Sequence, residues 1–187
     1  MFCLTSAEDT QTDRTSLIVD NCILRLANND LSAMEELYHR TKTSVYSFAL
    51  SILKNAHDAE DVLHDCYVLV WGAAGSYRSA GKPMAWLLTI TRNLCLKKLA
   101  ENKKAVPLDT DAALAKIDTS MPAEDRMIIS ECFRSLSDEE RQIVVLHAVS
   151  GFKHREIAQL LDMPVSTVLS KYNRALKKLR RILKGGE

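Results

Sequence analysis

The residues with the most suggestive spacing are basic side chains near the carboxyl end of the chain. Residues 169–187 hold seven Lys and Arg residues against one acid. On a helical wheel that starts at Pro164, one side carries only hydroxyl and basic residues: Ser166, Thr167, Ser170, Lys171, Arg174, Lys177, Lys178 and Arg181. Such a face is suited to neutralising phosphates. The alternative is an ordinary amphipathic helix with a solvated face, although that kind of face usually mixes both signs of charge.

The segment before this helix has helix-turn-helix spacing. Apolar residues between His154 and Leu161 predict a short helix, Asp162 and Met163 predict a turn, and Pro164 opens the long helix. In such motifs the second helix lies in the major groove of DNA. We therefore predict that the polar side of the long helix can meet duplex DNA. The opposite side is expected to pack inward through Val165, Val168, Leu169, Tyr172, Leu176, Leu179 and Leu183.

A second predicted helix, from Asp58 to Trp71, carries acidic residues on its outward arc. Asp58 and Asp61 lie in or near its first turn, where carboxylates cap amides and complement the helix dipole. Asp65 has no such role, and it lies four residues after Asp61, where like charges repel. A basic partner from another molecule would explain Asp65, whereas solvated surface acids are the alternative.

A loop and a helix with a different character follow that acidic helix. The predicted helix from Pro83 to about Asn102 is apolar on two sides and leaves Thr89, Arg92 and Asn93 on one polar arc. The loop before it offers Tyr77, Arg78, Ser79 and Lys82. An aromatic ring with basic and hydroxyl companions suits unstacked bases of single-stranded DNA, and a plain solvent loop is the alternative.

Other kinds of chemistry find little support in the sequence. The chain has five histidines and five cysteines, and no CxxC pair or glycine-rich phosphate loop is present. We therefore expect no catalytic centre, no metal and no cofactor. The acidic amino terminus lacks the apolar core of a signal peptide, and the longest aliphatic run, Ile143 to Leu146, is too short to span a bilayer. A cytoplasmic protein without a membrane segment is the expectation.

The elements that position these residues are predicted to be helices throughout. No stretch alternates apolar and polar residues as a half-buried strand would, so the predicted fold is all-α with two small helical domains joined by a flexible linker. Helices are expected from about Leu31, around Val45 to Leu53, and over the segments described above. Ser137 and Glu140 form a predicted capping box for a helix that ends at Ser150. The predicted division is a tail at 1–21, a domain at 22–104, an acidic linker at 105–121 and a domain at 122–187.

The charge distribution agrees with this division. The net charge of the whole chain is +1, but residues 22–104 carry +3 and residues 125–187 carry +4, while residues 1–21 and 105–124 each carry −3. Two basic blocks therefore alternate with two acidic ones, which keeps a nucleic-acid partner open despite the small total.

The order of these motifs resembles a known family. The blocks DAEDVLHDCYVLVW, PMAWLLTITRNLCLKKL and LSDEERQIVVLHAVSGFKHREIAQLLDMPVSTVLSKYNRALKKLRR, with the acidic linker between the second and third, are similar to the extracytoplasmic-function group of the sigma-70 family over roughly residues 22–183. The resemblance implies a non-enzymatic sigma factor that binds core RNA polymerase and directs transcription initiation at specific promoters. Its first domain would melt the minus-ten element, and its second would read the minus-thirty-five element.

The resemblance also implies roles for individual residues. The helix that binds the clamp coiled coil of the polymerase would contain Asp58, Glu60, Asp61 and Asp65. The flap of the polymerase is a second implied contact. The region that binds the minus-ten element would contain Tyr77, Arg78, Lys82, Arg92 and Asn93. Trp86 is expected to lie mainly in the core. The minus-thirty-five element would be read by Ser166, Thr167, Ser170, Lys171, Arg174 and Lys178. An anti-sigma factor is a further implied partner, although no residue indicates it.

Three positions depart from the family pattern. Lys97 stands where an acid is common, Leu169 where a lysine is common, and Pro164 where a serine is frequent. These departures bear on promoter preference.

Two other interpretations remain open from the residues. A helix-turn-helix regulator with an amino-terminal sensing or dimerisation domain would explain residues 137–184, but not the acidic helix followed by the WL...RN motif. The second open interpretation is a thiol-based sensor that uses Cys3 or Cys22.

Overall fold

The computed structural model describes residues 5–102 and 131–184, with side chains from residue 14 onward. Within these ranges every regular element is a helix, as predicted. They are α1 (Thr5–Ala27), α2 (Ser32–Leu53), α3 (Ala56–Ala73), the 3-10 turn η1 (Ala74–Ser76), α4 (Pro83–Asn102), α6 (Asp138–Ala148), α7 (His154–Leu161) and α8 (Val165–Lys184). Residues 131–135 are helical as well. The linker predicted at 105–121 lies outside the described residues.

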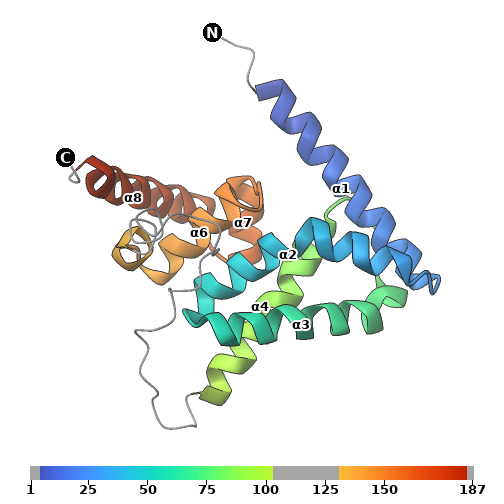
Figure 1. Cartoon of the computed structure of the whole chain (residues 1–187). Coiled ribbons are helices and arrows are strands. Elements are labelled where there is room, and N and C mark those ends of the chain that lie inside the picture. The colour runs from blue at the N-terminus through green and yellow to red at the C-terminus, as the bar shows by residue number, and fades with distance from the viewer. Residues whose placement is uncertain (1–4, 103–130, 185–187) are drawn as a thin grey trace.

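Helices α1 to α4 form the amino-terminal half. Helices α2, α3 and α4 pack against one another, and α1 lies along α2, with its first turns extending beyond the other helices (Figure 1). Most of the fully buried side chains at the centre are apolar, among them Ile23, Leu37, Phe48, Val62 and Leu87. Removing their surface from water is the main force that holds the four helices together.

Local signals explain where several of these helices begin and end. Lys54 ends α2 in a left-handed conformation with φ of 57°. Asn55 then caps α3 by accepting a hydrogen bond from the Asp58 amide at 3.1 Å. Pro83 occupies the first position of α4, where its missing amide hydrogen costs nothing.

Two elements differ from the prediction. The residues expected to form a tail up to residue 21 are helical from Thr5, and the second half of this helix packs inward through Val19, Ile23 and Leu26, a buried stripe at helical spacing. The two helices expected between Leu31 and Leu53 are one continuous helix, α2.

Helices α6, α7 and α8 form the carboxy-terminal half. The capping box is confirmed, because Ser137 Oγ accepts from the Glu140 amide and the Glu140 carboxylate accepts from the Ser137 amide at 2.9 Å. Arg141 is buried and donates to the carbonyls of Phe133 and Leu136 at 2.9 and 3.1 Å. Its guanidinium therefore satisfies carbonyls at the end of the helical segment that precedes α6.

The two halves contact each other. Helix α2 packs against α6, and α4 contacts α7 (Figure 1). Lys54 pairs with Asp138 at 2.6 Å, and Lys82 Nζ donates to Gln159 Oε1 at 3.4 Å. A cavity of about 110 Å³ lies where α1, the start of α4 and the α6–α7 turn meet. No helix in the described ranges has the length and apolar character needed to cross a membrane.

Candidate functional site

The acids at the start of α3 are engaged by a lysine of α4. Lys98 Nζ lies 2.5 Å from Asp61 Oδ2 and 3.4 Å from Asp58 Oδ1, and Asn102 donates to Asp58 at 3.0 Å. The hydrogen bond with Lys98 lowers the pKa of Asp61, and the same bond raises the pKa of Lys98. Asp58 and Asp61 therefore join α3 to α4, a contribution that the sequence did not reveal.

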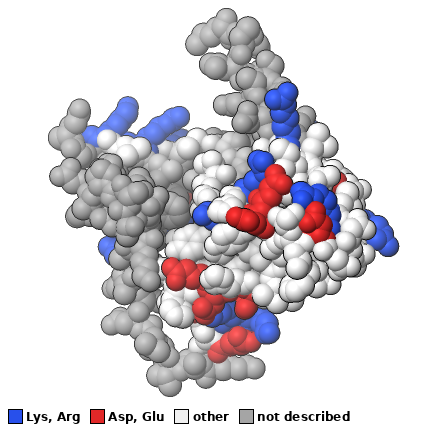
Figure 2. Space-filling model, turned by 45° about the vertical axis from the view of Figure 1, so that its right-hand side comes forward, with Lys and Arg blue, Asp and Glu red and all other residues white. Residues whose placement is uncertain are grey.

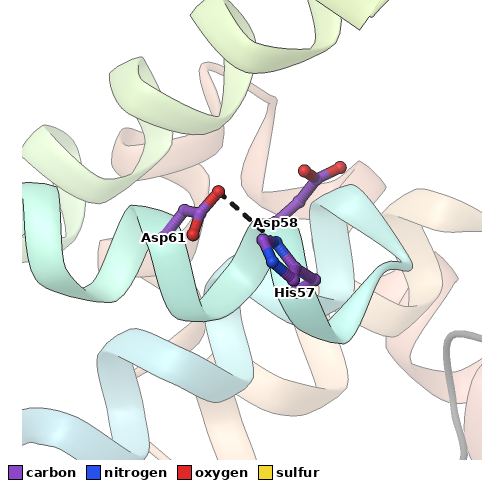
Figure 3. Close-up of side chains that lie close together, drawn as sticks. All are labelled: His57, Asp58 and Asp61. Carbon is purple, nitrogen blue, oxygen red and sulfur yellow. Dashed lines mark ion pairs between the residues drawn. The ribbon is translucent and has the colours of Figure 1, made fainter.

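His57 lies beside the same two carboxylates (Figure 3). Its Nδ1 is 3.5 Å from Asp61 Oδ2, and ligand atoms of His57, Asp58 and Asp61 all lie within 4.8 Å of one another. The ammonium group of Lys98 already pairs with both carboxylates, so a metal ion would compete with it for them. The cluster is explained by helix-to-helix pairing.

Glu60 and Asp65 are placed differently from Asp58 and Asp61. Glu60 is half-buried and Asp65 is exposed, and neither forms an ion pair with another residue in the described part of the chain. Asp65 is followed on α3 by Val68, Leu69 and Trp71, whose exposed fractions are 66%, 48% and 54%. Exposed apolar residues this close together on one helix form a candidate surface for contact with another molecule. The acids of α3 were predicted to bind a partner, whereas these apolar residues were not.

Acidic and basic side chains adjoin in the middle and lower part of the face that Figure 2 draws, whereas the basic side chains at its upper edge lie apart from acids. The acidic arc predicted for α3 is thus partly neutralised, and Asp65 is the carboxylate on that helix most available to a partner.

Tyr77 is turned inward, contrary to its predicted exposure to an extruded base. Its side chain is 7% exposed, its ring centroid lies 4.8 Å from that of Trp86, and its hydroxyl donates to Asp20 Oδ1 at 2.5 Å. Burial first, and Asp20 second, raise the pKa of Tyr77. The ring anchors the loop, while Trp86 packs against the core as expected.

The other residues predicted for the minus-ten region are accessible to different degrees. Arg78, Lys82 and Asn93 are exposed, whereas Arg92 is half-buried. Arg78 donates to the Tyr77 carbonyl at 3.4 Å, and Lys82 reaches Gln159 of α7. The two basic side chains of the loop therefore lie at its outer surface, and one of them contacts the other half of the molecule.

Helix α8 divides the six predicted duplex contacts into two groups. Ser166, Ser170 and Arg174 are exposed, and Thr167 is half-buried. Lys171 instead pairs with Glu139, and Lys178 Nζ lies 2.6 Å from Glu140 Oε2. These two lysines lie on the side of α8 that packs on α6, next to the buried Val168 and Ala175.

The outward face of α8 also contains residues that were predicted to pack inward or that were not predicted to contact DNA. Val165 and Leu169 were expected to pack inward, but they are exposed beside Ser166 and Ser170. Further along the helix Leu183 is exposed as well, although it too was expected to pack inward. The other exposed residues there are basic: Lys177, Arg180, Arg181 and Lys184. No acid lies between Arg174 and Lys184, and this pattern was the available signal for Arg180.

The described cysteines do not have the properties of reactive thiols. Cys22, Cys66, Cys95 and Cys132 are buried and reduced. Burial raises the pKa of Cys66 to about 11 and that of Cys95 to about 12, and it also raises the pKa of Cys22. Because the thiolate is the reactive form, Cys22 is a poor candidate for a redox sensor. Cys3 lies outside the described residues.

Family models and relatives agree with this arrangement. The family model described as Sigma-70 region 2 matches residues 37–105, and the one described as Sigma-70, region 4 matches residues 126–179. The ECF RNA polymerase sigma factor SigK of Mycobacterium tuberculosis is 29% identical over 179 residues, which cover 91% of this chain and 96% of that protein. SigK of Mycobacterium sp. (strain KMS) is 26% identical over 174 residues, which cover 88% and 90% of the two chains.

Two solved structures have the same fold. CnrH, in a complex with the cytosolic domain of CnrY, has a TM-score of 0.65 at 21% identity, and the match covers 91% of this chain and 99% of CnrH. The sigma factor RpoE, in a complex with the anti-sigma factor NepR from Bartonella quintana, has a TM-score of 0.67 at 22% identity, with coverage of 80% and 96%. The amino-terminal half, which a helix-turn-helix regulator leaves unexplained, matches region 2. This chain belongs to the extracytoplasmic-function group of the sigma-70 family.

Proposed function

We propose that this sigma factor directs core RNA polymerase to its promoters through three separate surfaces. The outward part of α3 binds the polymerase, the loop 77–82 with the middle of α4 engages the minus-ten element, and the outward face of α8 reads the minus-thirty-five element. The observation that carries the proposal is the separation of an exposed acidic and apolar surface on α3 from an exposed basic surface on α8. The chain itself performs no catalytic step in this role.

The polymerase surface on α3 centres on Asp65 and the exposed apolar residues that follow it. Asp65 would supply charge steering and register, and Val68, Leu69 and Trp71 would supply buried apolar area. The clamp coiled coil is the proposed partner of this surface, and the flap is a second contact on the polymerase. Glu60 would add a negative charge at the edge of this polymerase surface. Asp58 and Asp61 contribute mainly by holding α3 against α4.

The minus-thirty-five surface combines small and basic residues. Ser166, Ser170 and Arg174 are exposed near the amino-terminal half of α8, where side chains of a recognition helix approach base edges. Lys177, Arg180 and Arg181 follow them, and their charges suit the phosphate backbone. Leu169 adds an exposed apolar contact of the kind that thymine methyl groups accept.

The experiment that tests the proposal is reconstitution with core polymerase, followed by sequencing of transcript starts on genomic DNA. We expect initiation at a defined set of promoters that share minus-ten and minus-thirty-five sequences. Initiation that matches core polymerase alone would contradict the proposal.

The docking surface has its own test in the same system. Asp65→Arg should weaken core binding by about tenfold, because it places a like charge against a basic partner. Glu35→Arg, which reverses an exposed acid on α2, is the matched control and should leave binding unchanged. Equal binding by both variants and the unmodified chain would remove Asp65 from the interface.

An inhibitory protein is a further proposed partner. CnrH and RpoE were each solved with a bound protein, which for RpoE is described as an anti-sigma factor. We propose that this chain is held by an anti-sigma factor of its own, and that it works in the cytoplasm, where polymerase and genomic DNA are found.

A further inference from the structure

Helix α1 holds the loop between η1 and α4 at several points. Asp20 accepts hydrogen bonds from the hydroxyls of Tyr77 and Ser79, at 2.5 Å to Oδ1 and 2.7 Å to Oδ2. One turn earlier, Ser16 Oγ donates to the Gly81 carbonyl at 3.5 Å. Because Ser16 and Asp20 are four residues apart, they lie on the same face of α1. One helix face therefore holds the loop at three alternate residues.

These contacts limit which side chains of the loop remain at the surface. Tyr77 has φ of −61° and ψ of 136°, and its ring is turned toward α1 and α4. With residues 77, 79 and 81 held by α1, Arg78 and Lys82 stay exposed, and Lys82 also reaches Gln159 of α7. Gly81, with φ of 70°, then turns the chain into α4.

The hydrogen bond from Tyr77 is the central one of the three. Its ring is buried against Trp86, and a buried phenol needs a partner for its hydroxyl. Burial and the negative charge of Asp20 both raise the pKa of Tyr77, so the hydroxyl stays protonated and continues to donate. A short bond to a carboxylate is among the stronger hydrogen bonds in proteins.

We propose that Asp20 is a positioning residue for readout of the minus-ten element. Its carboxylate holds Tyr77 and Ser79 against α1 and thereby fixes loop 77–82 in the conformation that presents Arg78 and Lys82 to the opened DNA strand. The proposal rests on the minus-ten role proposed above, and it adds α1 to the parts of the chain that determine promoter choice.

The test uses holoenzyme reconstituted from the full chain and a promoter mapped from its own transcript starts. Open-complex formation is measured on the native minus-ten sequence and on a single-base variant of it. Asp20→Ala should lower the ratio between the two templates by about tenfold, since it removes two hydrogen bonds to the loop. Core binding and affinity for a minus-thirty-five duplex should stay unchanged. Asn21→Ala, at the next and exposed residue of α1, is the matched control.

A second variant separates positioning from folding. Tyr77→Phe keeps the buried ring and removes only the hydroxyl, so it should lower the same ratio in a folded chain. When Tyr77→Phe is combined with Asp20→Ala, the ratio should fall little further than in Asp20→Ala alone, because the hydrogen bond between Tyr77 and Asp20 is already lost in that variant. An equal fall on both templates, or an unchanged ratio in Tyr77→Phe, would overturn the proposal. A wild-type chain that opens no promoter at all would instead defeat the proposed function, and this inference with it.

Discussion

Lys178 joins the long carboxy-terminal helix to the beginning of α6 through one ammonium group. Its Nζ lies 2.6 Å from Glu140 Oε2, and the Glu140 side chain is only 5% exposed. Burial alone would raise the pKa of Glu140, but the bonds from Lys178 and Ser137 outweigh it and lower the pKa. Glu140 therefore remains charged inside the capping box, and Lys178 is the cation that neutralises it.

Removing Lys178 should destabilise the carboxy-terminal half rather than simply weaken DNA binding. We expect Lys178→Ala to lower the free energy of unfolding by about 2 kcal/mol, because Glu140 would lose its ionic partner in a buried position. Chemical denaturation of the full chain measures this change. The double variant with Glu140→Gln should recover part of the loss, and a single variant as stable as the unmodified chain would contradict the structural role.

Arg174 is the contrasting case on the same helix, because it is exposed and none of the ion pairs found among the described residues involves it. Arg174→Ala should leave the unfolding free energy within about 0.5 kcal/mol of its original value. It should weaken binding to a promoter duplex and reduce the slope of log affinity against log salt by about 1. An unaltered slope in a titration by fluorescence anisotropy would exclude a phosphate contact.

At the scale of the element, the helix-turn-helix contains a cluster of three rings. His147 of α6, His154 of α7 and Tyr172 of α8 lie with ring centroids 4.7 to 4.9 Å apart. His147 Nδ1 is 2.8 Å from the Phe152 carbonyl, and His154 Nε2 is buried with no hydrogen-bond partner among the described residues. Burial, and then the neighbouring His147, lower the pKa of His154. The folded motif thus favours the neutral imidazole.

Acid should therefore loosen this motif well before carboxylates titrate. The ordinary pKa of His is about 6.5, so above that pH both the folded and unfolded forms are neutral, and the stability is fully present. As the pH falls below about 6.5 the unfolded chain takes up a proton first, and the free energy of unfolding decreases until the lowered folded pKa is passed. Denaturation curves from pH 7.5 to 5 measure this trend. His154→Phe should reduce it, and an equal pH slope in that variant would show that another group is responsible.

Several elements could be predicted from local residues alone, and others depended on distant ones. Pro83, the Ser137–Glu140 capping box and Pro164 mark their helix boundaries through nearby backbone groups, and the structure agrees with them. The middle of α2 is buried through a distant contact, because the Thr41 hydroxyl bonds both the Leu37 carbonyl and the Tyr67 hydroxyl at 2.7 Å, and Tyr67 lies 26 residues further along the chain.

The candidate site shows the same limit. The types of the outward residues on α8 were readable from the sequence, but the wheel could not show that α6 presents Glu139 and Glu140 to Lys171 and Lys178. Tyr77 was predicted to contact an unstacked base because its partner, Asp20, lies 57 residues earlier, in the segment predicted to be a tail. Pairing between separate helices decides which charged side chains remain free.

At the scale of the whole molecule, the two halves are too close together to read both promoter elements at once. The names of the two elements give positions about 10 and 35 base pairs before the transcript start, so their centres lie about 25 base pairs apart. That separation is roughly 85 Å of B-form DNA at 3.4 Å per pair. In the structure α2 packs on α6, and Lys82 of the proposed minus-ten surface contacts Gln159 of the helix-turn-helix. Simultaneous readout therefore requires the halves to separate.

Separation can be followed by energy transfer between labels at Ser76 and Lys184, which are exposed and lie one in each half. We expect one short distance in the free chain and an increase of tens of ångströms in the complex with polymerase and promoter. Asp138→Lys should lengthen the distance in the free chain, because it sets two like charges together at the Lys54 contact. A Lys54→Glu change in the same variant should restore the short distance by exchanging the two charges. If the distance in the promoter complex equals that in the free chain, the halves act as one rigid unit, and at most one element is read by this chain.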